Sequence, residues 1–170
     1  MTDYLIVDGY NIINAWDHLK KSAEENLEIS RIELIDELSE YKGILWGKIV
    51  VVFDAHSAKQ KNRHTEQING ILVIYTKEGE TADSLIEALV YDLVDKGNVD
   101  VATSDWQEQR VIMGKGAVRL SARDLKKLIR ETKEKIRKNF IEKEEGKRNT
   151  LDNLLDQQVK EKLNILRHKK

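Results

Sequence analysis

The sequence predicts an α/β domain with three layers, in which helices flank a central, mostly parallel sheet of four or five strands. Two observations lead to this fold class. Short β-branched runs alternate along the chain with segments of helical periodicity, and the runs at 49–53 and 71–75 are almost continuously apolar. Strands of that kind are covered on both faces, as they are in parallel sheets. The 170 residues suffice for one such domain with an extension.

The expected elements follow in chain order. We expect strands at 5–7, 49–53, 71–75, 99–102 and 118–120, and helices near 30–41, 81–97, 104–114, 121–140 and 150–166. Ser30 and Glu33 form a capping-box pattern, and Thr81 is a second expected N-cap. Gly146 predicts a break between the last two helices. Residues 55–70 are polar, and we expect a loop or a short helix there.

Composition limits the possible classes of protein. The chain has no cysteine, so disulfides and thiolate metal sites are excluded, and any metal ligands must be oxygen or nitrogen atoms. It has no proline, which allows long uninterrupted helices. No apolar run approaches the roughly 20 residues of a membrane span, and the first residues do not resemble a signal peptide. We therefore expect a soluble, cytoplasmic protein without membrane contact.

Charge is distributed unevenly along the chain. Residues 1–114 carry 11 Lys/Arg against 21 Asp/Glu, whereas residues 115–170 carry 18 against 9. We expect a first domain at 1–120 and a basic, amphipathic helical extension at 121–170. The extension is either a surface for an acidic partner or simply a solvated, salt-bridged set of helices.

Acidic residues follow four of the expected strands. They are Asp8, Asp54, Glu80 with Asp83, and Asp105. Any one of them is readily explained as a helix N-cap or as an acid near a helix dipole. In a parallel sheet, however, all these strand ends lie at one edge, where ligands bind. Converging carboxylates repel one another unless a cation lies among them. An all-oxygen set suits Mg²⁺ or Mn²⁺, and hence phosphoryl chemistry.

Other sites common in α/β proteins are not supported. No G-x-G-x-x-G follows the first strand, and no G-x-S-x-G is present. The segment from Gly43 to Lys48 imitates a phosphate-binding loop, but it is one residue short and precedes a strand. The four histidines show no metal-ligand spacing, and His56 is more simply explained as a surface residue than as a site residue.

Four motifs in this order and spacing resemble a known family. They are "VDGYNII", "VVFDAH", "TKEGETADSLIE" and "VATSDWQEQ". Together they resemble the NYN branch of the PIN-like nucleases, and more narrowly the YacP-type ribosome-associated bacterial endoribonucleases. The resemblance implies a PIN-like fold with a divalent-metal site formed by Asp8, Asp83 and Asp105. Asp54 and Glu80 match accessory acidic positions, and Asn11 matches a polar position after the first strand.

The function implied is metal-dependent endonucleolytic hydrolysis of RNA, with mRNA on the ribosome as the expected context. One or two Mg²⁺ or Mn²⁺ ions would activate water and neutralise charge on the phosphate. Asn11 and Ser104 are candidate phosphate contacts, as are the basic residues Lys59, Lys61 and Arg63. Three aromatic residues near the motifs are candidates for base stacking, although core packing is the simpler interpretation of each: Tyr10, Trp16 and Trp106.

Two other classes of function remain open at this point. The chain could be a noncatalytic RNA- or ribosome-binding module in which the carboxylates are caps. The C-terminal amphipathic helices could instead serve protein interaction, including dimerisation. The oligomeric state and the RNA sequence that is cleaved cannot be predicted from these residues.

Overall fold

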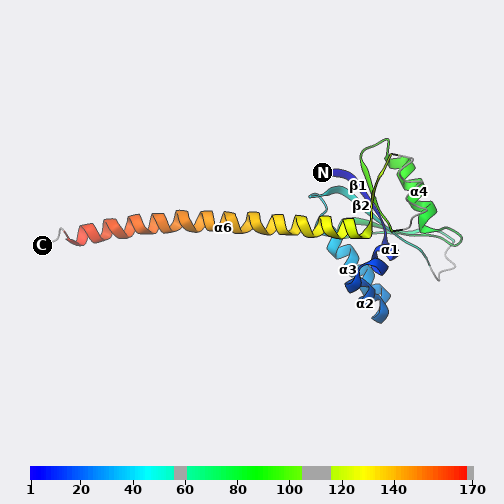
Figure 1. The fold of residues 1–170 in the computed structure, drawn as a ribbon, viewed down its shortest axis with the longest axis horizontal. Coiled ribbons are helices and arrows are strands. Elements are labelled where there is room, and N and C mark those ends of the chain that lie inside the picture. The colour runs from blue at the N-terminus through cyan, green and yellow to red at the C-terminus, as the bar shows by residue number, and fades with distance from the viewer. Residues whose placement is uncertain (56–60, 105–115, 168–170) are drawn as a thin grey trace. The chain divides into compact units, whose positions relative to one another are not determined.

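The computed structural model describes residues 1–55, 61–104 and 116–167, with side chains described up to Glu144. Groups of strands and groups of helices follow one another along the chain (Figure 1). In order they are β1 Thr2–Asp8, α1 Gly9–Ala15, α2 Asp17–Glu25, α3 Leu27–Ser39, β2 Trp46–Phe53, β3 His64–Ile68, β4 Ile71–Tyr75, α4 Ala82–Leu93, β5 Val99–Ala102, β6 Val118–Leu120 and α6 Ala122–Arg167. The predicted helix at 104–114 lies almost entirely outside the described residues.

The strands form one six-stranded sheet in the order β3-β4-β2-β1-β5-β6. Every neighbouring pair is parallel except β3 and β4, which are antiparallel. The predicted fold class, a mostly parallel α/β sheet, is therefore confirmed. All five expected strands are present, and β3 is an additional one.

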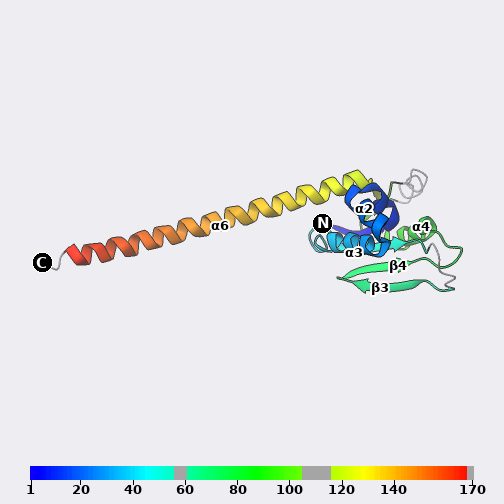
Figure 2. The ribbon, with the colours of Figure 1, turned by 90° about the horizontal axis from the view of Figure 1, so that it is seen from below.

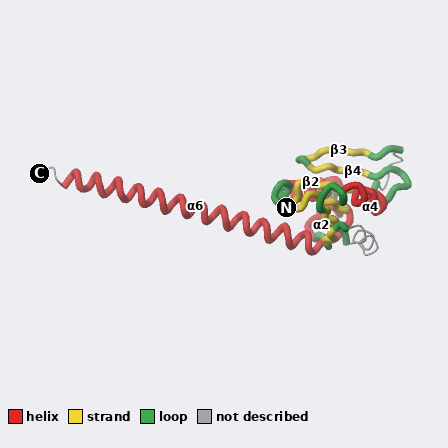
Figure 3. The backbone as a smooth tube through the Cα atoms, turned by 90° about the horizontal axis from the view of Figure 1, so that it is seen from above, coloured by secondary structure: helices red, strands yellow, loops and turns green. Residues whose placement is uncertain are grey.

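β3 lies at the margin of the sheet beside β4, as Figures 2 and 3 show. The prediction of a loop or short helix over 55–70 was wrong for its second half. β3 is a mostly polar edge strand, so it lacks the apolar run by which the other strands were recognised. A local signal was nevertheless present, because Asn69 (φ 51°) and Gly70 (φ 77°) form a tight two-residue hairpin turn.

Successive side chains of the central strands cover opposite faces of the sheet. Ile6 of β1 packs in a cluster with Val50 and Val52 of β2 and with Leu85 and Ile86 of α4. The alternate residues of the strands face the N-terminal helices, since α1 and α3 pack against β2. Figure 1 shows α4 and the α1–α3 group on opposite sides of the strands. Both faces of the central strands are thus covered by helices, as the continuous apolar runs predict.

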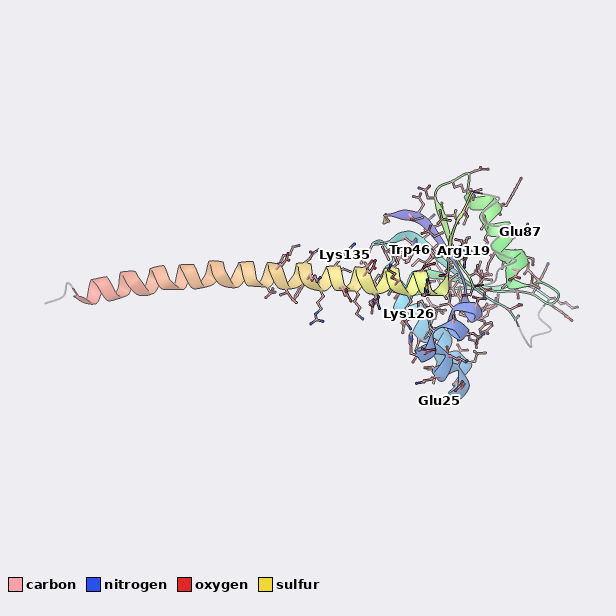
Figure 4. The ribbon with its side chains drawn as sticks, in the orientation of Figure 1. Glu25, Trp46, Glu87, Arg119, Lys126 and Lys135 are labelled. Atoms are coloured by element: carbon pink, nitrogen blue, oxygen red, sulfur yellow. The ribbon has the colours of Figure 1, made fainter. Side chains whose placement is uncertain are left out.

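The amino edge of the sheet is tied by a side-chain hydrogen bond. Trp46, labelled in Figure 4, is 1% exposed, and its indole N–H donates to the Asp100 carboxylate at 2.8 Å. Asp100 lies in β5 and Trp46 in β2, the two strands on either side of β1. This contact fixes the strands that flank β1 relative to each other.

The N-terminal helices differ from the prediction. Two helices, α1 and α2, precede the expected one, and α3 begins at Leu27 with Asn26 as its N-cap. Ser30 is not a cap. It is fully buried inside α3, where its hydroxyl donates to the Leu19 carbonyl of α2 at 2.9 Å. The capping-box pattern was therefore misleading, because Ser30 holds two helices together instead of starting one.

The C-terminal helix α6 runs without the break predicted at Gly146, so that prediction was wrong. A glycine inside a helix costs only about 1 kcal/mol relative to alanine, which a long helix without proline tolerates. The chain divides into two compact units, Met1–Lys127 and Leu128–Lys170. The predicted division at residue 120 stays a prediction, since compactness alone does not show which segments fold independently.

The first turn of α6 belongs to the first unit and packs on the N-terminal helices. The Trp16 indole N–H donates to the Ala122 carbonyl at 2.9 Å, and the ammonium of Lys126 lies 5.9 Å from the Trp16 ring centroid. Leu125 is fully buried. Trp16 is thus a core residue, which removes it as a candidate for base stacking.

Candidate active site at the carboxyl edge of the sheet

The carboxyl ends of β1, β2, β4 and β5 lie at one edge, because these strands are parallel. From β1 the chain leaves toward β2 on one side, and from β5 it leaves toward β6 on the other. The neighbouring strands β1 and β5 therefore mark the topological switch point of the sheet. In open α/β sheets, ligands bind in the crevice outside such a point.

Asp8 ends β1 at this point and is 8% exposed. Its Oδ1 accepts a hydrogen bond from the Asn11 backbone N–H at 3.2 Å, which makes Asp8 the N-cap of α1. Asp8 is therefore a helix cap, as the simpler interpretation of this acid predicted. A cap uses part of a carboxylate's four acceptor positions, so the same group retains the capacity to bind a cation.

Asn11 joins the two strands of the switch point. Its side-chain oxygen accepts the Ser104 backbone N–H at 2.6 Å, across 93 positions of sequence. The loop after β5 is thereby held against the first turn of α1. Asn11 and Ser104, both predicted site residues, are brought together, and Asp105 is the next residue in the chain.

Gly9 is needed where β1 turns into α1. A Cβ placed on Gly9 would lie 2.2 Å from Cε1 of the fully buried Phe53 ring. The helix thus begins immediately after Asp8 only because residue 9 has no side chain. Close packing against β2, more than backbone freedom, explains the glycine of the Asp-Gly pair.

Asp54 follows β2 and is held by a buried threonine. The Thr76 hydroxyl donates to Asp54 Oδ1 at 3.0 Å and accepts the Ala55 N–H, also at 3.0 Å. Thr76 itself is 0% exposed. One hydroxyl thus fixes both the Asp54 carboxylate and the backbone that follows it.

Replacing Thr76 by valine should lower the free energy of unfolding by about 1–3 kcal/mol, because the Ala55 N–H and one Asp54 oxygen lose a buried partner. Thr76→Ser keeps the hydroxyl and serves as the matched control, with a smaller loss. Urea denaturation of both variants measures the difference. A loss in Thr76→Ser with none in Thr76→Val would show that the methyl group, and not the hydrogen bonds, matters.

Glu80 and Arg63, predicted as a metal ligand and a phosphate contact, are paired with each other. The Arg63 Nε–H lies 2.9 Å from each Glu80 oxygen, and Nη2 also donates to Oε1. This hydrogen bonding holds the pKa of Glu80 below its ordinary value. The pair ties the start of β3 to the loop before α4. Lys61 is exposed two residues before Arg63.

Asp83 lies in the first turn of α4. Thr81 caps that helix by accepting the Ser84 N–H at 3.1 Å, so capping does not require Asp83. The adjacent Ala82 packs in the same core cluster as Ile6 of β1. The helix start is thereby anchored beside the central strand.

The predicted metal set is only partly described. Asp105, Lys59, His56 and Trp106 lie outside the described residues. Within the described part of the chain, no three His, Asp or Glu side chains are grouped so that they could hold an ion. The donors Asp8 and Asp83 have the oxygen chemistry that Mg²⁺ and Mn²⁺ prefer. That they form one metal-binding set with Asp105 stays a prediction.

A row of rings beside this edge was not predicted. It runs from Tyr10 of α1 through Phe53 and Tyr75, which end β2 and β4, to His64, which begins β3. The centroids of successive rings are 5.0, 5.6 and 5.7 Å apart. The available signal was that two apolar strands both end in an aromatic residue directly before a polar one.

Arg31 of α3 covers the inner part of this row. Its guanidinium carbon is 5.6 Å from the Tyr75 ring centroid and 6.0 Å from that of Phe53. Nη1 donates to the Tyr10 hydroxyl at 3.3 Å, and Nη2 pairs with Glu28. Burial raises the pKa of Tyr10, and it raises the pKa of Tyr75 to about 12, so both phenols are neutral near pH 7.

Comparisons with known proteins agree with this geometry. A family model described as the YacP-like NYN domain matches residues 5–168. The chain is 41% identical to the protein YacP of Bacillus subtilis (strain 168) over 152 residues, which are 85% of this chain and 88% of YacP. A crystal structure of a tryptophan-to-leucine mutant of Rae1 (YacP) from Bacillus subtilis is similar, with a TM-score of 0.67, 40% identity and 80% coverage of each chain. A second crystal structure of Rae1 (YacP) has a TM-score of 0.65, 37% identity and 98% coverage of each chain.

Among the residues that the structure describes, no helix has the length and apolar character needed to cross a membrane. The resemblance stated from the four motifs is confirmed by the family model and the relatives. The strands that begin or directly precede those motifs all belong to one sheet. The chain belongs to the YacP-like NYN domain family, which is a nuclease-type family.

Proposed function

We propose that this protein is a divalent-metal-dependent endoribonuclease that hydrolyses RNA phosphodiester bonds. One observation carries the proposal. The Asn11–Ser104 hydrogen bond holds the ends of β1 and β5 together at the switch point of the sheet. In the sequence, Asp8 precedes Asn11 by three residues, and Asp105 directly follows Ser104. The switch point is the place where an α/β sheet binds its ligand.

The residues have distinct proposed roles. Asp8, Asp83 and Asp105 would hold one or two Mg²⁺ or Mn²⁺ ions, which when bound supply an acidified water and positive charge against the phosphate. Asp54, fixed by Thr76, would accept a proton or orient water through its second oxygen. Asn11 and Ser104 keep the two loops in register, so that the acids on both sides face the same phosphate. The negative charge of Glu80 is balanced by Arg63, so its proposed role is to position the loop before α4.

Electrostatics support a role for the C-terminal segment, residues 115–170, in holding RNA. Residues 1–114 carry a net charge of −10, and such a surface repels a polyanion. Residues 115–170 carry +9, which offers phosphate contacts whose strength falls as salt rises. Lys59, Lys61 and Ser104 are further proposed contacts. We extend the proposal to mRNA on the ribosome, in the cytoplasm, as the working context.

Removal of divalent ions should abolish cleavage. Long RNA, free and on ribosomes, is incubated with the full-length protein in Mn²⁺, in Mg²⁺ or in excess EDTA, and internal cuts are read by primer extension. Cutting is expected in the metal-containing samples alone, and it should return when Mn²⁺ exceeds the chelator. Asp105→Asn should be inactive in every sample. Full activity in EDTA would overturn the proposed chemistry.

A noncatalytic RNA-binding module is the second candidate, and one observation favours it. Asp8 already caps α1, and Asp54 already has a buried partner, so both carboxylates stabilise the fold without any metal. The same experiment separates the two candidates. A module of this kind would bind RNA in EDTA and in Mn²⁺ alike and would cut in neither.

A further inference from the structure

We propose that His64 and Tyr75 form a stacking platform for an unpaired base of the RNA, so that the strand next to the scissile phosphate must be single-stranded. The inference rests on the proposed function and adds a base-binding site to it. It is carried by the row of rings from Tyr10 to His64, hereafter the aromatic row.

The aromatic row lies one residue before the polar edge. Phe53 and Tyr75 are register partners in β2 and β4, and His64 is the register partner of Tyr75 in β3. The three rings therefore share one face of the sheet. The next residue along each chain toward the edge is Asp54, Thr76 or Arg63, and these are the polar residues of the candidate site. A base on this row would place its own backbone beside that edge.

Burial decreases along the row. The Phe53 ring is fully buried, Tyr75 is partly buried, and the His64 side chain is 57% exposed. Arg31 and Tyr10 cover the buried end, as the cation–π and hydrogen-bond contacts show. The open end is therefore at β3, the outermost strand. A flat ligand can extend the row only from the His64 side.

The surroundings favour a nucleobase over a protein partner. β3 has the sequence His-Thr-Glu-Gln-Ile and is mostly exposed, so the strand that carries the ring is mostly polar. Protein interfaces centre on an apolar, desolvated core, which this strand does not offer. A base needs only a π-face, with cationic groups near its phosphates. Lys61, exposed three residues before His64, supplies such a group.

The platform would select for unpaired RNA. In an A-form duplex the bases are stacked on one another, and their faces are closed to a protein side chain. Single-stranded bases can be splayed out and stacked on rings. The aromatic row would therefore distinguish single-stranded RNA from duplex RNA. The acidic edge alone would not, because the phosphate chemistry is the same in both.

The test measures binding in the Asp8→Asn background, so that RNA stays intact. Full-length protein is titrated against a short fluorescein-labelled single-stranded RNA, the same RNA with abasic sites, and the corresponding duplex. His64→Ala should weaken single-strand binding about 5- to 150-fold, which is the range for loss of one base-stacking contact. His64→Trp keeps a ring and should bind at least as tightly as the parent. The abasic RNA should bind weakly to every variant, without dependence on His64.

His18→Ala is the matched control. His18 is also an exposed histidine, stacked on an aromatic ring 5.9 Å away and paired with a glutamate, but it lies on α2. Its loss should leave RNA affinity unchanged. Unchanged single-strand affinity in His64→Ala would overturn the platform, and it is the result that a protein-docking role for His64 predicts. An equal loss of affinity for abasic RNA would also overturn it.

The two proposals fail in different ways. If the wild-type protein cuts RNA but His64→Ala binds as tightly as the parent, the platform is wrong and the nuclease stands. If binding depends on His64 but the wild-type protein never cuts, the nuclease is wrong and the platform stands. Thermal denaturation detects a folding defect in His64→Ala. If there is one, the RNA affinity of His64→Trp compared with that of the parent decides the outcome.

Discussion

Replacement of Asp8 by asparagine should lower RNA cleavage by at least about 100-fold, since even residues that only orient metal ligands cost 10- to 100-fold when changed. The variant removes the negative charge from the most buried of the described acids at this edge. A neutral amide oxygen is a weaker ligand for a hard divalent ion. Cleavage of a labelled RNA in Mn²⁺ measures the effect.

The fold should survive this change. Asparagine is as good an N-cap as aspartate, so the hydrogen bond from the Asn11 N–H can be kept. RNA binding should largely remain, because most of the proposed phosphate contacts are basic residues in other parts of the chain. Asp17→Asn is the matched control: it removes an exposed acid from the first turn of α2 and should retain full activity. Retained cleavage in Asp8→Asn would show that Asp8 acts only as a cap.

Truncation of Phe53 to alanine should lower the free energy of unfolding by about 3–5 kcal/mol, the usual cost of deleting a buried aromatic ring. The ring is 0% exposed and contacts Tyr10 and Tyr75 in the aromatic row. Chemical denaturation with linear extrapolation measures the loss.

Gly9→Ala tests the same contact from the other side. The new methyl would lie 2.2 Å from the Phe53 ring, and overpacking of this kind costs about 1–3 kcal/mol. In the Phe53→Ala background the methyl has room, so the double variant should be more stable than the two single losses predict. Additive losses would mean that Gly9 is required for its backbone conformation instead of for space.

The strand ends and the acids that follow them could be predicted from the sequence, because both signals are local. A continuous apolar run identifies a covered strand, and parallel pairing then fixes which ends meet. The partners of those acids could not be predicted in the same way. Thr76 reaches Asp54 across 22 positions, and Arg63 reaches Glu80 across 17. Such pairings depend on strand register, which no local pattern specifies.

Two local signals were misread for opposite reasons. Ser30 has the sequence pattern of a cap, but burial converts its hydroxyl into a link between helices. Asn69 and Gly70 form a hairpin turn, but the polar strand before them hid it. In both cases the local pattern was misread because of the tertiary environment. Ser30 is buried between helices, and the strand before Asn69 lies at the edge of the sheet.

The hydrogen bond between Asn11 and Ser104 has a consequence for the order of events during synthesis. Its partners are 93 positions apart, so closing that loop carries an entropic cost that local contacts do not offset. The two halves of the edge meet only after β5 has left the ribosome, although Asp8 is made almost at once. A nascent chain that contains the first acid therefore carries no complete edge. Under the proposed function, cleavage competence would arise in one late step, so a partly made chain could not cut the RNA from which it is being translated.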